Sequence, residues 1–170
     1  MLERIQNALR GLFGAAPPAS SAAQSDAAWA FVGRVMRDHH FTPGAQEWLR
    51  ANVNLEVDDL GTATEESVDY PDYARKVAKQ VADGHVDQGL LICGSGTGMA
   101  ITANKVPGVR AAVAWSEETA RLARQHNDAN VLAIGARTTP SEQIPAIVRA
   151  WFSTDFEGGR HADRVKKIEQ

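Results

Sequence analysis

The sequence lacks several features that mark particular classes of protein. Its only cysteine is Cys93, so neither an internal disulfide framework nor a zinc site of several thiolates can form. Basic residues number 18 against 21 acidic ones, and the net charge of -3 gives no general attraction to nucleic acid. No apolar run approaches the length of a membrane span. Because a lone thiol fits a reducing compartment, we expect a cytoplasmic protein. The charge balance and the lack of a long apolar run lead us to expect no nucleic-acid or membrane partner.

The composition fits one globular domain preceded by a short extension. Hydrophobic residues make up 44% of the 170 residues, enough for a sizeable core. Residues 1–26 differ from the rest, because a short amphipathic stretch is followed by small residues, serine and proline, as in a linker. We therefore expect 1–26 to be a loosely ordered extension and 27–170 to form the folded domain.

Strand and helix patterns alternate along this domain. Strands are expected over residues 28–37, 52–58, 86–93, 109–115 and 130–134. Helices are expected over 45–51, 70–83, 97–104, 116–127, 140–152 and 161–170. Strands joined through helices form parallel βαβ units. The pattern predicts an α/β fold with a mostly parallel five-stranded sheet covered on both faces, and ligands of such sheets bind where strands end and helices begin.

A glycine-rich segment follows the third of these strands. Its sequence is Cys93-Gly94-Ser95-Gly96-Thr97-Gly98. Alternating glycines let the backbone turn its N–H groups toward one point, which the positive end of the next helix also faces. This is an anion site for a phosphate, a carboxylate or the oxyanion of an enediolate. A thiol at its mouth is a usable base or nucleophile, although position alone equally allows a purely structural cysteine.

The same loop also resembles a dinucleotide-binding fingerprint, with one mismatch. Such a fingerprint needs a glycine at the position of Met99. Glu117 does stand about twenty residues further on, where a ribose-binding acid would lie. Loop geometry alone therefore leaves dinucleotide binding as the main alternative.

Other polar residues stand at the boundaries of the expected elements. Tyr70 begins a helix, where its hydroxyl can point into the strand-end cleft, although the neighbouring residues read as plain helix capping. His126 and Asn127 lie between a helix and a strand, and a histidine there can carry protons or simply complement the helix dipole.

Arginines provide candidate phosphate ligands. Arg160 and Arg164 are four residues apart on one helical face, where two guanidinium groups suit a phosphate as well as a solvated basic face. Arg137, after the last expected strand, is a third candidate. The segment Asp38-His39-His40 suggests metal ligands, but adjacent side chains of an extended segment point apart. We therefore expect neither a metal nor another cofactor.

Five ordered segments together resemble the RpiB/LacAB family of sugar-phosphate isomerases over about residues 57–170. They are Asp69-Tyr70-Pro71-Asp72-Tyr73-Ala74, Ile92 to Gly98, Ala103-Asn104-Lys105, Arg121 to Asn130 and Glu157-Gly158-Gly159-Arg160-His161. The resemblance implies a metal-free aldose–ketose isomerase with a Rossmann-like three-layer α/β/α fold. It also implies a homodimer, or a dimer of dimers, whose active sites straddle the subunit interface.

The resemblance also implies roles for the loop residues. Cys93 would be the base that moves a proton between C1 and C2 of the sugar. The main-chain N–H groups of 94–98 would stabilise the enediolate, and Tyr70 would contact the sugar. Some members carry a glutamate base at the position of Thr97, so Thr97 belongs to the catalytic loop and Cys93 is the expected base.

Further roles implied by the resemblance fall on residues from two subunits. His126 would assist ring opening and Asn127 would bind substrate, both supplied by the partner subunit. Arg160 and Arg164 would hold the phosphate, joined by Arg137 from across the interface. The simplest substrate is ribose 5-phosphate, converted to ribulose 5-phosphate. Allose 6-phosphate, galactose 6-phosphate, a tetrose phosphate, or a binding module without catalysis are the alternatives.

The N-terminal part departs from the family. Members start with a strand that ends in Ser/Cys-Asp-His-Ala/Val-Gly, whereas about thirty residues precede Arg37-Asp38-His39-His40-Phe41 here. The family uses the aspartate, matched by Asp38, for sugar hydroxyls and ring opening. It uses the histidine, matched by His39, for the phosphate. Either the first βα unit is remodelled, or the chain has lost part of its site.

Overall fold

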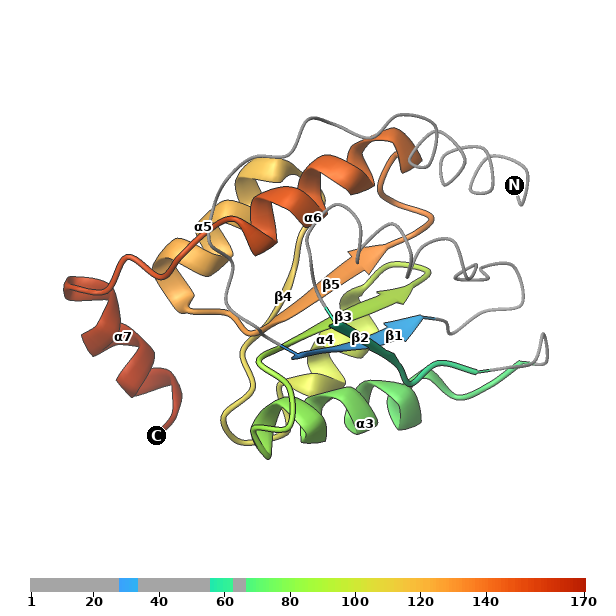
Figure 1. Cartoon of the computed structure of the whole chain (residues 1–170), viewed down its shortest axis with the longest axis horizontal. Helices are drawn as coiled ribbons and strands as arrows, with labels where there is room; N and C mark the ends of the chain where they lie inside the picture. Colours follow the sequence, from blue (N-terminus) through green and yellow to red (C-terminus); the bar gives the residue numbers. More distant parts are fainter. Residues whose placement is uncertain (1–27, 34–55, 63–66) are drawn as a thin grey trace.

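The structure, a computed structural model, describes residues 28–33, 56–62 and 67–170 (Figure 1). The expected extension 1–26, the expected helix over 45–51, and the candidates Asp38 and His39 lie outside the described residues.

The described strands form one parallel sheet in the order β2-β1-β3-β5-β4. Every adjacent pair runs parallel. The strands are β1 (Ala28–Gly33), β2 (Glu56–Asp59), β3 (Gln88–Cys93), β4 (Ala111–Val113) and β5 (Val131–Gly135). The central strands β3 and β5 are almost wholly buried, as their apolar sequences predict. The predicted α/β class with a parallel sheet is confirmed.

The helices lie close to their predicted positions. They are α3 (Tyr70–Ala82), α4 (Thr97–Ala103), α5 (Glu117–Asn127), α6 (Ile144–Phe152) and α7 (Arg160–Ile168), with a short 3-10 turn, η1 (Ser141–Gln143), before α6. Ser116 starts α5 by accepting a hydrogen bond from the N–H of Thr119. Gly84 follows α3 with a φ of 70°, a left-handed conformation that suits a helix end.

Strand β4 is shorter than the predicted 109–115, and side chains bond to the backbone on either side of it. At its start, the N–H of Arg110 donates to Asn130 Oδ1 at 2.8 Å. At its end, the N–H of Trp115 donates to Thr119 Oγ1 at 3.2 Å, within the cap of α5. Main-chain bonds to β5 continue at both points, since the carbonyl of Arg110 accepts the N–H of Val131 at 3.3 Å and the N–H of Ala114 donates to the carbonyl of Ala133 at 3.0 Å.

Helices cover both faces of the sheet (Figure 1). Apolar residues of α3 and α4, such as Val77 and Met99, pack with Leu91 on one face. On the other face, Ile147 and Trp151 of α6 pack with residues of β3 and β5. Burial of these side chains is the main stabilisation of the fold, at about 1.5–3 kcal/mol for each large apolar side chain. No described helix is both long and apolar enough to span a membrane.

Helix α7 projects from one end of the molecule, opposite the carboxyl ends of the strands (Figure 1). Its C-terminal end is anchored to the body by Glu169. One carboxylate oxygen lies 2.6 Å from Arg110 Nη1, and the other accepts the N–H of Gly108 at 3.2 Å. The Arg110 side chain is largely buried, so the anchor is shielded from solvent more than a surface ion pair.

Candidate active site

The thiol of Cys93 lies at the mouth of the glycine-rich loop. Cys93 ends β3 and is buried, and its Sγ accepts the N–H of Gly96 at 3.2 Å. Gly96 has a φ of 77° and forms the N-cap of α4. The sulfur therefore lies against the main-chain amide of Gly96, at the positive end of a helix. This is the arrangement that the loop sequence predicts.

The end of β5 holds this loop in place. The N–H groups of Ala136 and Arg137 donate to the carbonyls of Cys93 and Gly94 at 2.8 and 3.0 Å. Gly135 permits the close approach, since a Cβ there would lie 2.7 Å from the Ser95 carbonyl group. As a result, Arg137 stands at the same edge of the sheet as Cys93.

Tyr70 packs against the far side of the loop. A Cβ on Gly98 would come within 2.8 to 2.9 Å of the tyrosine ring and hydroxyl, so the ring lies directly on the backbone of Gly98. Ser95 and Thr97 are exposed, and Ser95 Oγ accepts the N–H of Thr97 at 3.4 Å. The structure thus gathers one group of predicted site residues at the carboxyl edge of the sheet: Tyr70, Cys93, Gly94, Ser95, Gly96, Thr97, Gly98 and Arg137.

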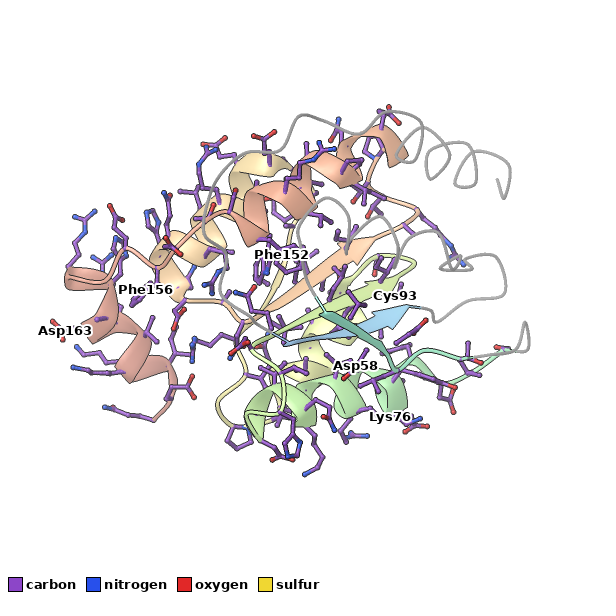
Figure 2. The ribbon with its side chains drawn as sticks, in the orientation of Figure 1. Asp58, Lys76, Cys93, Phe152, Phe156 and Asp163 are labelled. Atoms are coloured by element: carbon purple, nitrogen blue, oxygen red, sulfur yellow. The ribbon has the colours of Figure 1, made fainter. Side chains whose placement is uncertain are left out.

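The remaining predicted residues lie at the opposite edge. His126 and Asn127 end α5, just before β5 begins, and Arg160 and Arg164 are exposed on α7. Figure 2 shows Cys93 at one end of the sheet and α7, marked by Asp163, at the other. A single chain therefore does not bring the predicted phosphate ligands Arg137, Arg160 and Arg164 together.

The turn after α5 is held by two arginines. Asp128 adopts a left-handed φ of 44°, unusual for a residue other than glycine. Its carboxylate oxygens accept from Arg110 Nη2 at 3.0 Å and Arg124 Nη1 at 3.2 Å. Arg110 Nε also donates to the carbonyls of Asn127 and Asp128. Sequence reasoning gave these residues no role, because the distance between Arg110 and Asp128 along the chain conceals their contact.

His126 is one of three titratable residues in close contact. Its ring stacks on that of His161 with centroids 4.2 Å apart, and Glu157 faces both rings. Burial lowers the pKa of His161 below its usual value, and His126, Arg160 and Arg164 act in the same direction, while Glu157 opposes them. His161 is therefore held in its neutral form at neutral pH.

Among the described residues, these three also form a group that could hold a metal ion, because their potential ligand atoms lie within 4.8 Å of one another. The two rings are parallel within 3°. A metal ion lies in the plane of each imidazole that binds it, at about 2.0–2.1 Å from the nitrogen for zinc. Parallel stacked rings cannot both direct a lone pair at one ion, so as arranged the trio does not fit a metal. The absence of a metal cofactor stays a prediction.

A substitution at Gly96 tests whether the loop geometry matters for activity. A Cβ there would lie 3.1 Å from backbone atoms of Ile134 and Gly135, in a left-handed residue. We expect Gly96→Ala to destabilise the fold by more than the about 1–2 kcal/mol that left-handed strain alone costs, and to remove most of the activity that the family resemblance implies. Thermal unfolding and turnover measure the two effects.

Gly84→Ala is the matched control. Gly84 has a similar φ of 70°, but a Cβ there meets nothing within 4 Å. It should show the strain cost alone and unchanged turnover. Equal stability and equal turnover of the two variants would contradict the role given to the loop.

Comparisons with known proteins place the chain in a family. Residues 37–168 match the family model described as Ribose/Galactose Isomerase. The chain belongs to this family. Ribose-5-phosphate isomerase B of Escherichia coli (strain K12) is 52% identical over 114 residues, which are 67% of this chain and 76% of the relative. Putative sugar phosphate isomerase YwlF of Bacillus subtilis (strain 168) is 46% identical over 121 residues, 71% of this chain and 81% of the relative.

Solved structures of this family share the fold. Type B ribose 5-phosphate isomerase of Trypanosoma brucei has a TM-score of 0.78 at 41% identity, covering 84% of this chain and 97% of that chain. Ribose-5-phosphate isomerase B of Mycoplasma genitalium, solved with bound ribulose-5-phosphate, has a TM-score of 0.76 at 39% identity, covering 84% and 94%. The predicted family and enzyme class, a sugar-phosphate isomerase, are confirmed. The family match favours this assignment over dinucleotide binding at the loop.

Proposed function

We propose that this enzyme interconverts ribose 5-phosphate and ribulose 5-phosphate through an enediolate, without a metal. The observation that carries the proposal is the thiol of Cys93, which faces the N–H of Gly96 at 3.2 Å in a loop of alternating glycines. Proton abstraction next to a carbonyl needs a base and a nearby stabiliser for the oxyanion. The loop supplies both within one short segment. The Escherichia coli relative, 52% identical, is named for the same reaction, and the Bacillus subtilis relative is named a putative sugar phosphate isomerase.

In the proposed reaction, Cys93 acts as the base. Its thiolate takes the proton from C2 of the open-chain aldose, and the carbonyl oxygen at C1 gains negative charge. The N–H groups of the loop then stabilise this oxyanion, together with the dipole of α4. The thiol returns the proton to C1, and the hydroxyl proton on the C2 oxygen passes to the C1 oxygen, so that C2 becomes the ketone and C1 carries the hydroxyl group. In this proposal Thr97, which is exposed at the start of α4, contacts the reacting oxygens, and Tyr70 contacts the sugar.

We propose that a second copy of the chain completes each site. The carboxyl edge holds the base and Arg137, whereas His126, Asn127, Arg160 and Arg164 lie at the far edge of the same chain. In a two-fold dimer, the far edge of one copy can cover the carboxyl edge of the other. His126 then assists ring opening, and the three arginines surround the phosphate. Asp38 and His39 are assigned to the sugar and phosphate by family resemblance, and these two assignments stay predictions.

Turnover assays test the proposed substrate. Wild-type protein should convert ribose 5-phosphate to ribulose 5-phosphate, followed by NMR of the anomeric and ketose signals, without added metal and in the presence of a chelator. Allose 6-phosphate, galactose 6-phosphate and erythrose 4-phosphate are assayed in parallel, and we expect lower kcat/KM for each. Thermal stabilisation by ribose 5-phosphate without any ketose formation would refute the proposal in favour of a binding module.

A further inference from the structure

His126 lies in a side-chain cluster to which the sequence analysis gave no role of its own. Its imidazole stacks in parallel on that of His161, with 4.2 Å between centroids and 3° between planes. One carboxylate oxygen, Glu157 Oε2, lies 3.6 Å from His126 Nε2 and 3.5 Å from His161 Nε2. The same nitrogen of each ring therefore faces one oxygen.

The backbone fixes this arrangement from two directions. The N–H of Glu157 donates to the carbonyl of Gln125 at 3.0 Å, which ties the segment before α7 to the last turn of α5. Gly158 and Gly159 then take φ values of 67° and 55°, and the N–H of His161 donates to the carbonyl of Gly158. The chain thus turns sharply into α7 and returns His161 to the ring of His126. These main-chain bonds hold the backbone of Glu157 and His161 beside the last turn of α5.

The three side chains differ in their access to solvent. His161 is buried at 5% exposure, whereas the side chain of His126 is 39% exposed and that of Glu157 is 60% exposed. His161 therefore backs the ring of His126 from inside, and His126 presents its other side outward. Among the charged groups that act on His161, Glu157 is the one that opposes the effect of Arg160, Arg164 and His126.

We propose that Glu157 is a positioning residue for His126 in sugar ring opening. The buried ring of His161 fixes the plane of the His126 imidazole by stacking on it. The inference rests on the proposed function, in which His126 assists ring opening. A carboxylate beside Nε2 keeps the proton on that nitrogen and leaves Nδ1 to exchange protons with the sugar.

The step balances with water as the second proton carrier. The C1–O4 bond of the furanose breaks, and O4 takes the Nδ1 proton of the imidazolium form of His126. The C1 hydroxyl gives its proton to water and becomes the aldehyde, and the imidazole later regains its proton from solvent. Glu157 keeps its charge throughout and takes no proton from the sugar.

The test separates ring opening from proton transfer at carbon. Ribulose 5-phosphate is acyclic, because its C5 oxygen carries the phosphate, so exchange of its C1 proton in D2O needs the base but no ring opening. Glu157→Gln should lower kcat for ribose 5-phosphate by about 10–100-fold, less than the roughly 10²–10⁴-fold that a general acid or base itself contributes, and leave KM within about threefold. Its exchange of the ribulose 5-phosphate proton should stay within about twofold of wild type.

Glu118→Gln is the control. Glu118 is an exposed glutamate in the first turn of α5, far from His126 along the helix, and the variant should leave both rates unchanged. An equal loss of turnover and exchange in Glu157→Gln, or no loss of turnover, would overturn the inference. Wild-type protein with neither turnover nor exchange would instead overturn the proposed function on which it rests.

Two variants at His161 test the role of its stacked ring. His161→Phe keeps a flat ring against His126, and we expect turnover within about fivefold of wild type. His161→Ala removes the ring and should lose turnover as Glu157→Gln does, with the exchange rate retained. Thermal unfolding shows whether each variant is folded. If both variants are folded and His161→Ala turns over faster than His161→Phe, the result contradicts the role of the His161 ring.

Discussion

Replacing Cys93 by alanine is expected to lower the turnover of ribose 5-phosphate by about 10²–10⁴-fold, the range that a positioned base contributes. The change removes the proposed base and leaves the backbone of the glycine loop in place. Exchange of the C1 proton of ribulose 5-phosphate in D2O should fall in parallel, because that exchange requires the same base. Both rates are measured by NMR on protein whose unfolding temperature is compared with wild type.

Cys93→Ser and Thr97→Val provide the comparison for this result. Serine retains a hydrogen-bonding group beside the N–H of Gly96, but its hydroxyl is a much weaker acid than a thiol, so turnover should also be lost. Thr97→Val keeps the shape of the residue and should lose less than Cys93→Ala. Full turnover in Cys93→Ala together with loss in Thr97→Val would assign the base to the threonine position instead.

Mixing two inactive variants should restore activity if the site is shared between subunits. Cys93→Ala damages the carboxyl edge of the sheet, and Arg160→Ala combined with Arg164→Ala damages the opposite edge. In a two-fold dimer, a mixed dimer has both lesions in one site and none in the other. Random reassociation of equal amounts makes half the dimers mixed, so about a quarter of wild-type activity should return.

The mixing experiment has one outcome that supports a shared site and one that contradicts it. Each homodimer alone should remain inactive, and activity should rise with the fraction of mixed dimer separated by a charge tag. No recovery in mixtures that are shown to exchange subunits would contradict a shared site. Mixing Cys93→Ala with Gly96→Ala is the control, because both lesions lie at the same edge and the mixed dimer has no intact site.

Local sequence signals predicted most of the fold. The apolar run at residues 90–93 and the helical spacing of Ala74, Val77, Ala78 and Val81 correspond to β3 and α3. These patterns succeed because burial of one face imposes a period that is visible in a short window. The ends of the edge strand β4 were less predictable, because they involve side chains outside the strand. The N–H of Arg110 donates to Asn130, which is distant in the sequence, and the N–H of Trp115 donates to Thr119 in the next helix.

The sequence by itself determined the chemistry of the glycine loop, because a strand end, three glycines and a helix start are consecutive in the chain and need no other part of the molecule. The family assignment followed from motifs of the same local kind. Only the tertiary structure decided that Cys93 and His126 occupy opposite edges of the sheet, and that Glu157 and His161 lie against His126. Those relations depend on how parallel strands and returning helices alternate in space, and residue spacing does not record them.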